Sequence, residues 1–361
     1  MTPILEIQNL SHIYSPDTPF EHPALTNVDL TIGRGEFVGL IGHTGSGKST
    51  LMKQVVRLAL QRRQPVEEIR CSSDAASLDG VILPQIKTVL LDATPPHALE
   101  PQFPGAVEQP YSLCDCWNED ILRSEREEII ALGRDIGGLH RQAVRYLAGA
   151  GALLGEARRL AAEAIDYEKL RQYTVRLAAR ELPDLEKQGQ EERRLLSAVT
   201  DRGVILFHET ISAMCERVVF LEDPHGAVAA TMLGQLRDEA VARGYHVITC
   251  PCPISPEKPD HLLIPQAGLA FVTGNSLHAI PLEGRAVHAQ RFTDSSMLRA
   301  RRVRLRFLQK TAGVLLRQAE QAITEAHRRH NALEQYYIGA TDFTAVDRLT
   351  ERLLRRLSAE M

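Results

Sequence analysis

Residues 42–49 read Gly42-His43-Thr44-Gly45-Ser46-Gly47-Lys48-Ser49, and this stretch decides the fold of the 361-residue chain. It fits G-x-x-x-x-G-K-[ST], the Walker A pattern of a phosphate-binding loop. Residues 36–41 before it, with Phe37, Val38, Leu40 and Ile41, predict a buried parallel strand, and residues 50–56 after it predict the first turns of a helix. The pattern therefore stands between a strand and a helix, where it has physical meaning.

The residue types in this loop suit a nucleotide with magnesium. Glycines let backbone N–H groups turn toward phosphate oxygens, and the helix N-terminus adds a favourable dipole. The Lys48 ammonium suits the β- and γ-phosphates, and the Ser49 hydroxyl suits Mg²⁺. We therefore expect ATP and Mg²⁺ as cofactors, held by Gly42, His43, Thr44, Gly45, Ser46, Gly47, Lys48, Ser49 and Thr50.

A carboxylate for the metal is expected at the end of a hydrophobic strand. Residues 88–92 read Thr-Val-Leu-Leu-Asp, so Asp92 is our candidate, and with Lys48 it forms the candidate catalytic pair. The plain alternative is a strand-end aspartate that caps a turn. Asp74 and Asp79 compete for the same metal role.

Composition limits the classes of protein. The length favours two domains over one core. Contents of 44% hydrophobic and 24% charged residues are typical of a globular protein, and a net charge of −4 gives no strong nucleic-acid signal. No apolar run approaches 18 residues, and residues 1–6 lack the features of a signal peptide. We expect a cytoplasmic protein with no integral membrane segment.

The chain repeats itself internally. One series of matching positions differs by 181: Cys71 and Cys252, Asp79 and Asp260, Pro84 and Pro265, Gln85 and Gln266, His97 and His278. A second series differs by 176, as residues 141–143 match 317–319 and residues 164–167 match 340–343. A constant register over two long blocks predicts two copies of one α/β unit, each followed by a helical extension.

The two copies differ at the phosphate-binding loop. The offset of 181 places Gly45 on Gly226, Lys48 on Ala229 and Asp92 on Thr273. We therefore expect one competent nucleotide site, in the first copy, and one that has been lost.

We expect an α/β fold with two tandem P-loop NTPase-like lobes, each a doubly wound parallel sheet. Strands are predicted at 37–41, 66–71 and 87–92, with a helix at 48–63. The helix-favouring sequence from 118 to 187 is interrupted by glycines within 137–138 and 149–151, which predicts two or three helices packed as a hairpin. The expected domains are 1–117, 118–195, 196–294 and 295–361, with the helices near 120–180 as a lid.

Several other features allow a functional and a plain interpretation. His97 suits a γ-phosphate sensor and Gln85 suits a residue that positions water, but both recur in the second copy, which favours a structural role. Arg123 is a candidate arginine finger, and the basic run Arg299–Arg306 is either a solvated surface or a contact to an anionic partner. The pairs at 114–116 and 250–252 are C-x-C, not the C-x₂-C of zinc ribbons, and ordinary half-buried cysteines are favoured over a metal site.

Residues 4–53 resemble the start of an ABC-type ATPase, above all the ATPase subunits of energy-coupling-factor transporters. The resemblance rests on residues 4–14, 19–25, 28–32 and 35–51, which end in the Walker A loop. It implies that Tyr14 stacks on the adenine, whereas the alternative is a core tyrosine. After residue 53 the chain contains no L-S-G-G-Q signature and no L-L-x-D-E-P segment.

Residues 48–361 resemble a different group, an uncharacterised bacterial family of tandem P-loop ATPases. This resemblance rests on residues 71–84, 92–97 and 103–107, and it implies the two-lobed fold but no settled activity. A natural fusion and an artificial chimera would both explain the leader at 1–47.

The function we expect is Mg-ATP binding, with slow hydrolysis in the first lobe. Three alternatives stay open: an energy-coupling ABC ATPase subunit, a non-hydrolysing ATP-dependent switch and a small-molecule kinase. Besides nucleotide, the partners left open are a second copy of the chain or an unidentified protein.

Overall fold

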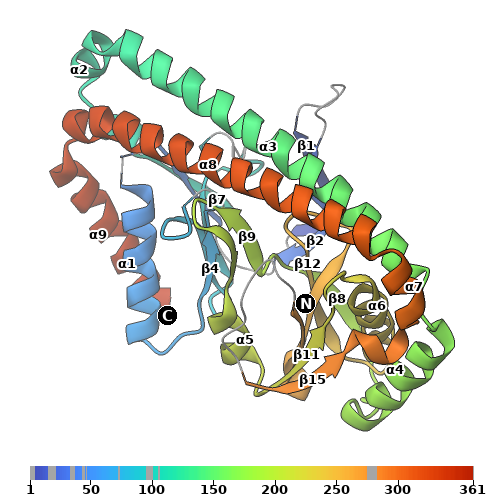
Figure 1. Ribbon diagram of the computed structural model, residues 1–361. Helices are drawn as coiled ribbons and strands as arrows, with labels where there is room; N and C mark the ends of the chain where they lie inside the picture. The colour runs from blue at the N-terminus through green and yellow to red at the C-terminus, as the bar shows by residue number, and fades with distance from the viewer. Residues whose placement is uncertain are drawn as a thin grey trace. The chain divides into compact units, whose positions relative to one another are not determined.

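The computed structural model describes residues 5–14, 22–32, 37–42, 45, 47–71, 74–94, 101–104, 106–274 and 283–360 (Figure 1). Two compact units emerge from them, one of residues 1–139 with 325–361 and the other of residues 140–324. We call these unit 1 and unit 2. No helix in the described ranges is long and apolar enough to cross a membrane.

Unit 1 contains a five-stranded sheet. Its strands are β3 (Phe37–Ile41), β4 (Glu67–Arg70), β5 (Leu78–Leu83), β6 (Thr88–Asp92) and β7 (Glu108–Ser112), in the order β4-β5-β6-β3-β7. The Walker A segment leads into α1 (Lys48–Gln61), whose buried face includes Leu51, Met52 and Val55. The strands expected at 37–41, 66–71 and 87–92 and the helix expected at 48–63 are confirmed to within two residues.

The expectation of a purely parallel sheet was wrong. β3 runs parallel to β6 and β7, but β5 is antiparallel to both β4 and β6. The prediction also missed β5 itself. A parallel pair needs a crossover of a dozen or more residues, and the links 71–77 and 84–87 are too short for one. These links therefore return the chain as an antiparallel meander.

The sheet of unit 2 repeats this plan. Its strands are β8 (Gln190–Arg193), β11 (Arg217–Glu222), β12 (His246–Pro251), β13 (Pro259–Ile264), β14 (Leu269–Gly274) and β15 (Arg285–His288). The order is β15-β11-β14-β13-β12-β8, with β11 parallel to β14 and β15, and β13 antiparallel to its neighbours. Without β8, the strand order and directions are those of unit 1, as the repeat in the sequence predicts.

Two smaller sheets complete the strands. β1 (Leu5–Tyr14) and β2 (His22–Ile32) form an antiparallel pair, and within the described ranges neither strand pairs with the five-stranded sheet. The second pair joins β9 (Ser197–Thr200) to β10 (Gly203–Leu206). The remaining helices are α2 (Glu119–Ser124), α3 (Arg126–Ala162), α4 (Tyr167–Glu181), α5 (His208–Met214), α6 (Ala227–Ala242), α7 (Ser295–Ala300), α8 (Arg302–Ala340) and α9 (Phe343–Glu360), with 3₁₀ turns η1 (Cys114–Cys116), η2 (Pro265–Ala267) and η3 (Ala289–Phe292).

The glycines of the first helical extension do not break it, so the expected hairpin with breaks at 137–138 and 149–151 was wrong. α3 runs through 37 residues without interruption. Two of these glycines allow close packing instead. A Cβ at Gly149 would lie 3.1 Å from Leu315 Cδ1, and one at Gly151 would lie 2.9 Å from the carbonyl oxygen of Ile254.

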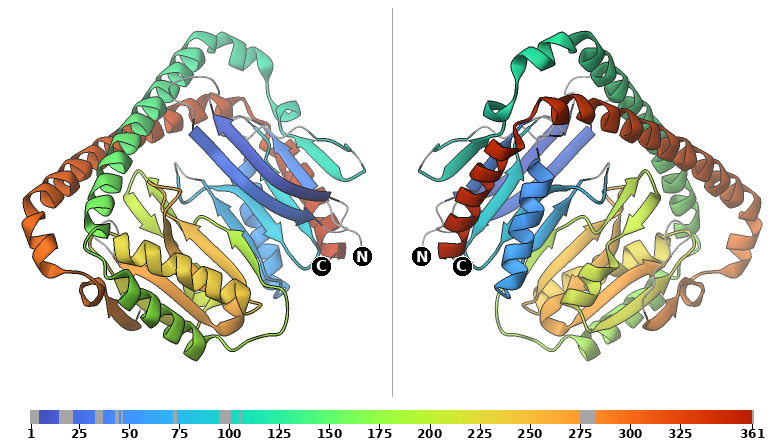
Figure 2. Two further views of the ribbon diagram at one scale, coloured as in Figure 1. Left: turned by 90° about the vertical axis from the view of Figure 1, so that its right-hand side faces the viewer. Right: turned by 90° about the vertical axis from the view of Figure 1, so that its left-hand side faces the viewer.

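The last helix of each repeat packs in the unit that holds the other repeat's sheet. α4 belongs to the first repeat, but Leu170 and Leu177 join the core of unit 2 beside α6. α9 belongs to the second repeat, but Val346 and Leu353 join the core of unit 1 beside α1. Figure 2 shows both pairs, α4 with α6 and α9 with α1.

Equivalent backbone bonds fasten the two exchanged helices. In unit 1, Asn118 N–H donates to the Ala340 carbonyl at 2.7 Å. In unit 2, at the offset of 176, Asp294 N–H donates to the Ala164 carbonyl at 2.8 Å. The four domains expected from the sequence follow one another along the chain. The bonds and cores described here instead place the last helix of each repeat in the unit that contains the other repeat's sheet.

Candidate functional site

The N-terminus of α1 carries the predicted lysine. Gly47 caps the helix in the left-handed conformation, with φ of 90°, which glycine adopts without steric cost. Lys48 is the first residue of the helix, and only 9% of it is exposed. Its Nζ donates to the Gly42 carbonyl oxygen and lies 3.5 Å from Asp92 Oδ2.

Burial and neighbouring charges act in opposite directions on the pKa of Lys48. Burial lowers its pKa, while the charge of Asp92 and a hydrogen bond to it act in the other direction. The charges of Cys114 and Asp79 also favour the protonated form. A buried cation held against one carboxylate is poised to take a stronger anionic partner.

β6 places Asp92 next to the strand that leads into the loop. Asp92 pairs with Leu40 in the parallel register of β6 and β3. Its Oδ1 accepts from the backbone N–H of Thr94 at 2.9 Å, and the Thr94 hydroxyl donates to the Gly42 carbonyl at 2.7 Å. The carboxyl ends of β3 and β6 therefore lie side by side at one edge of the sheet, and open α/β sheets bind ligands at this edge.

Ser49 and the competing aspartates have distinct surroundings. The Ser49 hydroxyl oxygen accepts from the backbone N–H of Leu78 at 3.1 Å, which leaves it a second lone pair. Asp74 accepts from the Ser77 hydroxyl at 2.6 Å and from the Ala76 N–H at 3.0 Å, an arrangement that stabilises a turn. Asp79 lies in β5, near enough to Lys48 to influence its charge.

Other predicted residues lie elsewhere or outside the described residues. His43, Thr44, Ser46 and His97 are outside them, as is the side chain of Tyr14, whose backbone pairs with His22 in the β1–β2 sheet. Gln85 is in the turn before β6, at the end of that strand opposite Asp92, so it does not reach the site. The exposed side chain of Arg123 pairs with Glu119 at 2.6 Å on its own helix. Thr50 is exposed on the first turn of α1.

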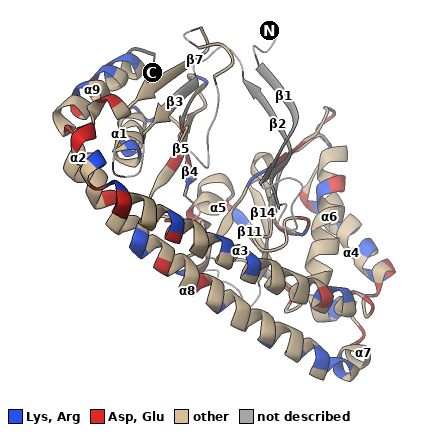
Figure 3. Cartoon of the chain, turned by 90° about the horizontal axis from the view of Figure 1, so that it is seen from above, with Lys and Arg blue, Asp and Glu red and all other residues tan. Residues whose placement is uncertain are grey.

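The basic run in α7 and α8 is partly neutralised within unit 2. Arg301 lies 2.5 Å from Glu163, and Arg304 lies 2.7 Å from Glu156. Figure 3 shows that α3 and α8 both carry basic and acidic residues. This pairing favours the plain interpretation of the run, a solvated surface.

Sequence reasoning missed two contributions to the site in unit 1. One is Thr94, two residues after Asp92, which ties the strand end to Gly42. The other is the second half of α8, which lies against Gly45: a Cβ on that glycine would be 2.8 Å from the Glu334 carbonyl oxygen. No sequence pattern links residues almost 290 positions apart, so only the folded chain reveals this contact.

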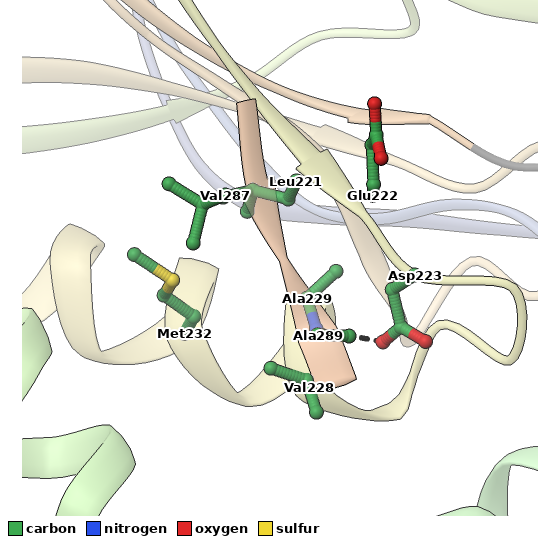
Figure 4. Close-up of a pocket in the computed structure, with 8 residues that line it drawn as sticks. All are labelled: Leu221, Glu222, Asp223, Val228, Ala229, Met232, Val287 and Ala289. Carbon is green, nitrogen blue, oxygen red and sulfur yellow. Dashed lines mark hydrogen bonds between the residues drawn. The ribbon is translucent and has the colours of Figure 1, made fainter. Parts of the chain in front are cut away.

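The equivalent junction in unit 2 is filled by the protein's own carboxylate. Asp223 is 3% exposed, and its two oxygens accept from the backbone N–H groups of His225 and Ala229, each at 3.0 Å. Figure 4 shows the bond from Ala229. The space lined by Asp223, Ala229, Val287 and their neighbours is too small to admit a water molecule. An anion of the chain thus lies at the start of α6.

The alignment of the two loops at the offset of 181 was wrong. The left-handed cap of α6 is Gly226, with φ of 70°, so it corresponds to Gly47 and not to Gly45. Six residues, 42–47, separate β3 from α1, but only four, 223–226, separate β11 from α6. Ala227 therefore takes the place of Lys48, and the second loop is two residues too short for the Walker A pattern.

Comparison with known proteins places the first part of the chain. Residues 25–79 match the ABC transporter family. Over 100 residues the chain is 41% identical to the energy-coupling factor transporter ATP-binding protein EcfA2 of Clostridium perfringens, covering 28% of this chain and 32% of that protein. Over 51 residues it is 59% identical to EcfA2 of Clostridium acetobutylicum, covering 14% and 18%.

These matches confirm the resemblance of the N-terminal region to the start of an energy-coupling-factor ABC ATPase. The chain spans about a third of the length of the first relative and less of the second. No solved structure matches the chain. The mixed sheets with parallel strands and the matched segment fit a P-loop NTPase.

Proposed function

We propose that this protein binds Mg-ATP at the N-terminus of α1 and hydrolyses it slowly. One observation carries the proposal: the buried Lys48 ammonium, behind the left-handed Gly47, lies 3.5 Å from Asp92 at the carboxyl end of the neighbouring parallel strand. The relatives matched over this region are ATP-binding proteins by name, which supports the assignment.

Each residue has a role that its position supports. Lys48 would exchange its bonds to Gly42 and Asp92 for the β- and γ-phosphates, and the backbone from Gly45 to Thr50 would cradle them. Ser49 and Asp92 would hold Mg²⁺, whose charge neutralises the phosphate oxygens when it is bound. Tyr14 stays our proposal for the adenine platform. Catalysis would come from positioning and charge neutralisation by these residues.

We further propose that the second repeat is a P-loop lobe that has lost its nucleotide. The order and directions of its strands match those of unit 1, and a glycine in the left-handed conformation still caps α6. Ala227 replaces the lysine, and the Asp223 carboxylate takes the backbone N–H group of Ala229 that an anion would otherwise use. A phosphate would meet like charge at this helix, so binding there is opposed.

Nucleotide titration with a matched pair of variants tests the site. Lys48→Ala is expected to weaken Mg-ATP binding about 10- to 100-fold, since a charge-assisted contact is worth about 1.5–3 kcal/mol and about 1.4 kcal/mol corresponds to tenfold. Arg57→Ala removes an exposed cation from the same helix and is expected to bind as wild type does. Calorimetry with no heat from folded wild type would exclude the proposal.

Turnover separates an ATPase from a switch. Radiolabelled phosphate release is expected from wild type and not from Lys48→Ala. Equal release by both proteins would rule out hydrolysis at this site, while tight binding without release would identify a non-hydrolysing switch.

An ATPase subunit of an energy-coupling-factor transporter is the second candidate. It is favoured by the 41% identity to EcfA2 over 100 residues and by the ABC transporter family match over residues 25–79, which includes the whole strand–loop–helix segment. If it is right, the protein should co-purify with a membrane component when expressed in a native host. A cytoplasmic location and a homodimer stay predictions that fractionation and light scattering would test.

A further inference from the structure

The corner where α7 leads into α8 exposes a basic face of unit 2. Residues 295–310 contain six cations and no acidic residue. Arg301 and Arg304 are each paired with a glutamate of α3. The other four cations are exposed and form no ion pair among the residues that the structure describes: Arg299, Arg302, Arg306 and Lys310. We call residues 295–310 the basic corner.

The charge of the basic corner opposes the folding of its own helix. α8 begins at Arg302, and a helix N-terminus is the positive end of the dipole, where cations are unfavourable. Arg302, Arg306 and Lys310 also follow one another at a spacing of four residues, which places like charges side by side. Beside them, Val303 and Phe307 are 80% and 63% exposed. A partner that is both anionic and apolar would relieve the repulsion and cover these side chains.

The chain itself carries a surface of this kind in unit 1. Where α2 leads into α3, residues 119–130 contain five acidic residues and two arginines. Ile121 and Ile130 are 42% and 40% exposed at this corner. Two of the acidic residues pair with Arg123. The other three are exposed and form no ion pair within the described ranges: Glu125, Glu127 and Glu128. We call residues 119–130 the acidic corner.

The two corners are equivalent parts of the two repeats, with opposite charge. Asn118 caps α2 by accepting from the backbone N–H groups two and three residues ahead, and Asp294 caps α7 in the same way at the offset of 176. At that offset Glu125 corresponds to Arg301, and each is the C-cap residue of its short helix. The same local structure thus presents an acidic surface in one unit and a basic surface in the other.

We propose that two copies of this chain associate by docking the basic corner of one copy on the acidic corner of the other. Opposite charges would set the orientation, while the exposed valine, phenylalanine and isoleucines would exclude water at the centre of the contact. Each copy has one corner of each kind, so every copy can supply either side of the contact. The proposal adds an assembly surface to the protein and does not depend on ATP binding.

A charge swap followed by analytical ultracentrifugation tests this contact. Each variant alone carries two corners of like charge, so its association is expected to be about 100-fold weaker than that of wild type. Mixing the two variants places opposite charges at every contact again, which is expected to restore association to near the wild-type level. High salt should weaken the wild-type association. The two variants reverse the acidic corner and the basic corner in turn: Glu125→Lys/Glu127→Lys/Glu128→Lys and Arg302→Glu/Arg306→Glu/Lys310→Glu.

The matched control reverses three exposed cations of α4, which also lies in unit 2: Lys169→Glu/Arg171→Glu/Arg176→Glu. It changes the total charge as much as reversal of the basic corner does, and it should associate as wild type does. Circular dichroism checks that all variants are folded. A wild type that stays monomeric at every accessible concentration, corner variants that associate normally, or a mixture of folded variants that stays monomeric would each overturn the proposal. A monomeric wild type that binds vesicles of anionic lipid through the basic corner would also overturn it, in favour of a membrane contact.

Discussion

Gly45 shows how much can depend on a missing side chain. Its φ of 77° lies in the left-handed region, and the Glu334 carbonyl oxygen lies only 2.8 Å from where a Cβ would be. The Walker A pattern accounts for the first of these constraints, because the loop must turn its N–H groups inward. The second constraint comes from α8, and the pattern does not contain it.

Gly45→Ala is expected to destabilise unit 1 by about 1–3 kcal/mol and to weaken Mg-ATP binding, because it combines left-handed strain with a collision against α8. Chemical denaturation followed by hydrogen exchange measures the loss. Gly138→Ala is the matched control in the same unit: nothing lies within 4 Å of its Cβ position inside α3, so it should stabilise by about 0.5–1 kcal/mol. A neutral Gly45→Ala would contradict the packing described here.

Lys258 and Asp260 form a buried ion pair in unit 2, and Asp260 is 1% exposed. Burial favours the neutral acid, but the charges of Lys258 and His261 outweigh it, so the pKa of Asp260 lies below its ordinary value. The pair therefore contributes stability above the pKa of the unfolded chain, about 4, and this contribution disappears as the pH falls through the folded value.

Lys258→Met is expected to cost about 3–5 kcal/mol at pH 7, because it leaves the Asp260 carboxylate buried without a partner. In the double variant Lys258→Met/Asp260→Leu the charge is gone, and most of the loss should be recovered. Unfolding free energies from pH 7 to pH 3 provide the measurement. A single variant as stable as the double one would show that the pair does not act as described.

At the scale of elements, the start of α6 contrasts with the start of α1. Both helices begin after a left-handed glycine that follows a parallel strand, so both present free N–H groups and a positive dipole end. In unit 2 the Asp223 carboxylate satisfies this helix end from within the chain. Neither helix has an acidic residue in its first turn, and in unit 1 the nearby carboxylate of Asp92 lies 3.5 Å from Lys48 Nζ instead.

Asp223→Ala is expected to lower the stability of unit 2 by about 1–2 kcal/mol, because it removes the acceptor of an N–H group in the first turn of α6. Hydrogen exchange at residues 225–231 should report it locally. Asp238→Ala, at an exposed position farther along α6, serves as the control and should change little. Equal effects of the two substitutions would show that Asp223 does not cap the helix.

At the scale of the whole molecule, the two repeats exchange their last helices. α9 completes the core of unit 1, and α4 completes the core of unit 2. Neither repeat holds its full core in one continuous stretch of chain. The candidate nucleotide site consequently depends on residues 343–360, although its own Walker A motif ends at Ser49.

Leu353 and Leu177 occupy equivalent positions at the offset of 176, and both are buried, at 1% and 3% exposure. Leu353→Ala is expected to destabilise unit 1 by about 2–5 kcal/mol and to weaken Mg-ATP binding, because it opens a cavity beside α1. Leu177→Ala should destabilise unit 2 by a similar amount and leave Mg-ATP binding intact. Hydrogen exchange resolved by unit distinguishes them. Loss of protection in the same unit for both variants would contradict the exchange.

Much of this protein follows from local chemistry alone. The strand at 37–41 and α1, which begins at the Walker A lysine, could be predicted directly, because an apolar strand and a helix start each have a local sequence pattern. Asp92 at the end of β6 follows from the same reasoning. The internal repeat could also be predicted, because matching residues of the two copies keep a constant offset in the sequence.

Long-range contacts determined the rest. Gly149 and Gly151 look like helix breaks, yet they lie within α3, because close neighbours in the fold make the absence of a side chain favourable. The loop before α6 is two residues shorter than the Walker A loop, so a constant sequence offset misaligned the two. The left-handed conformation of Gly226 at the start of α6 shows that this residue corresponds to Gly47. The positions of α9 beside α1 and of Glu334 on Gly45 depend on which apolar faces meet when the chain closes on itself, and no local pattern encodes that pairing.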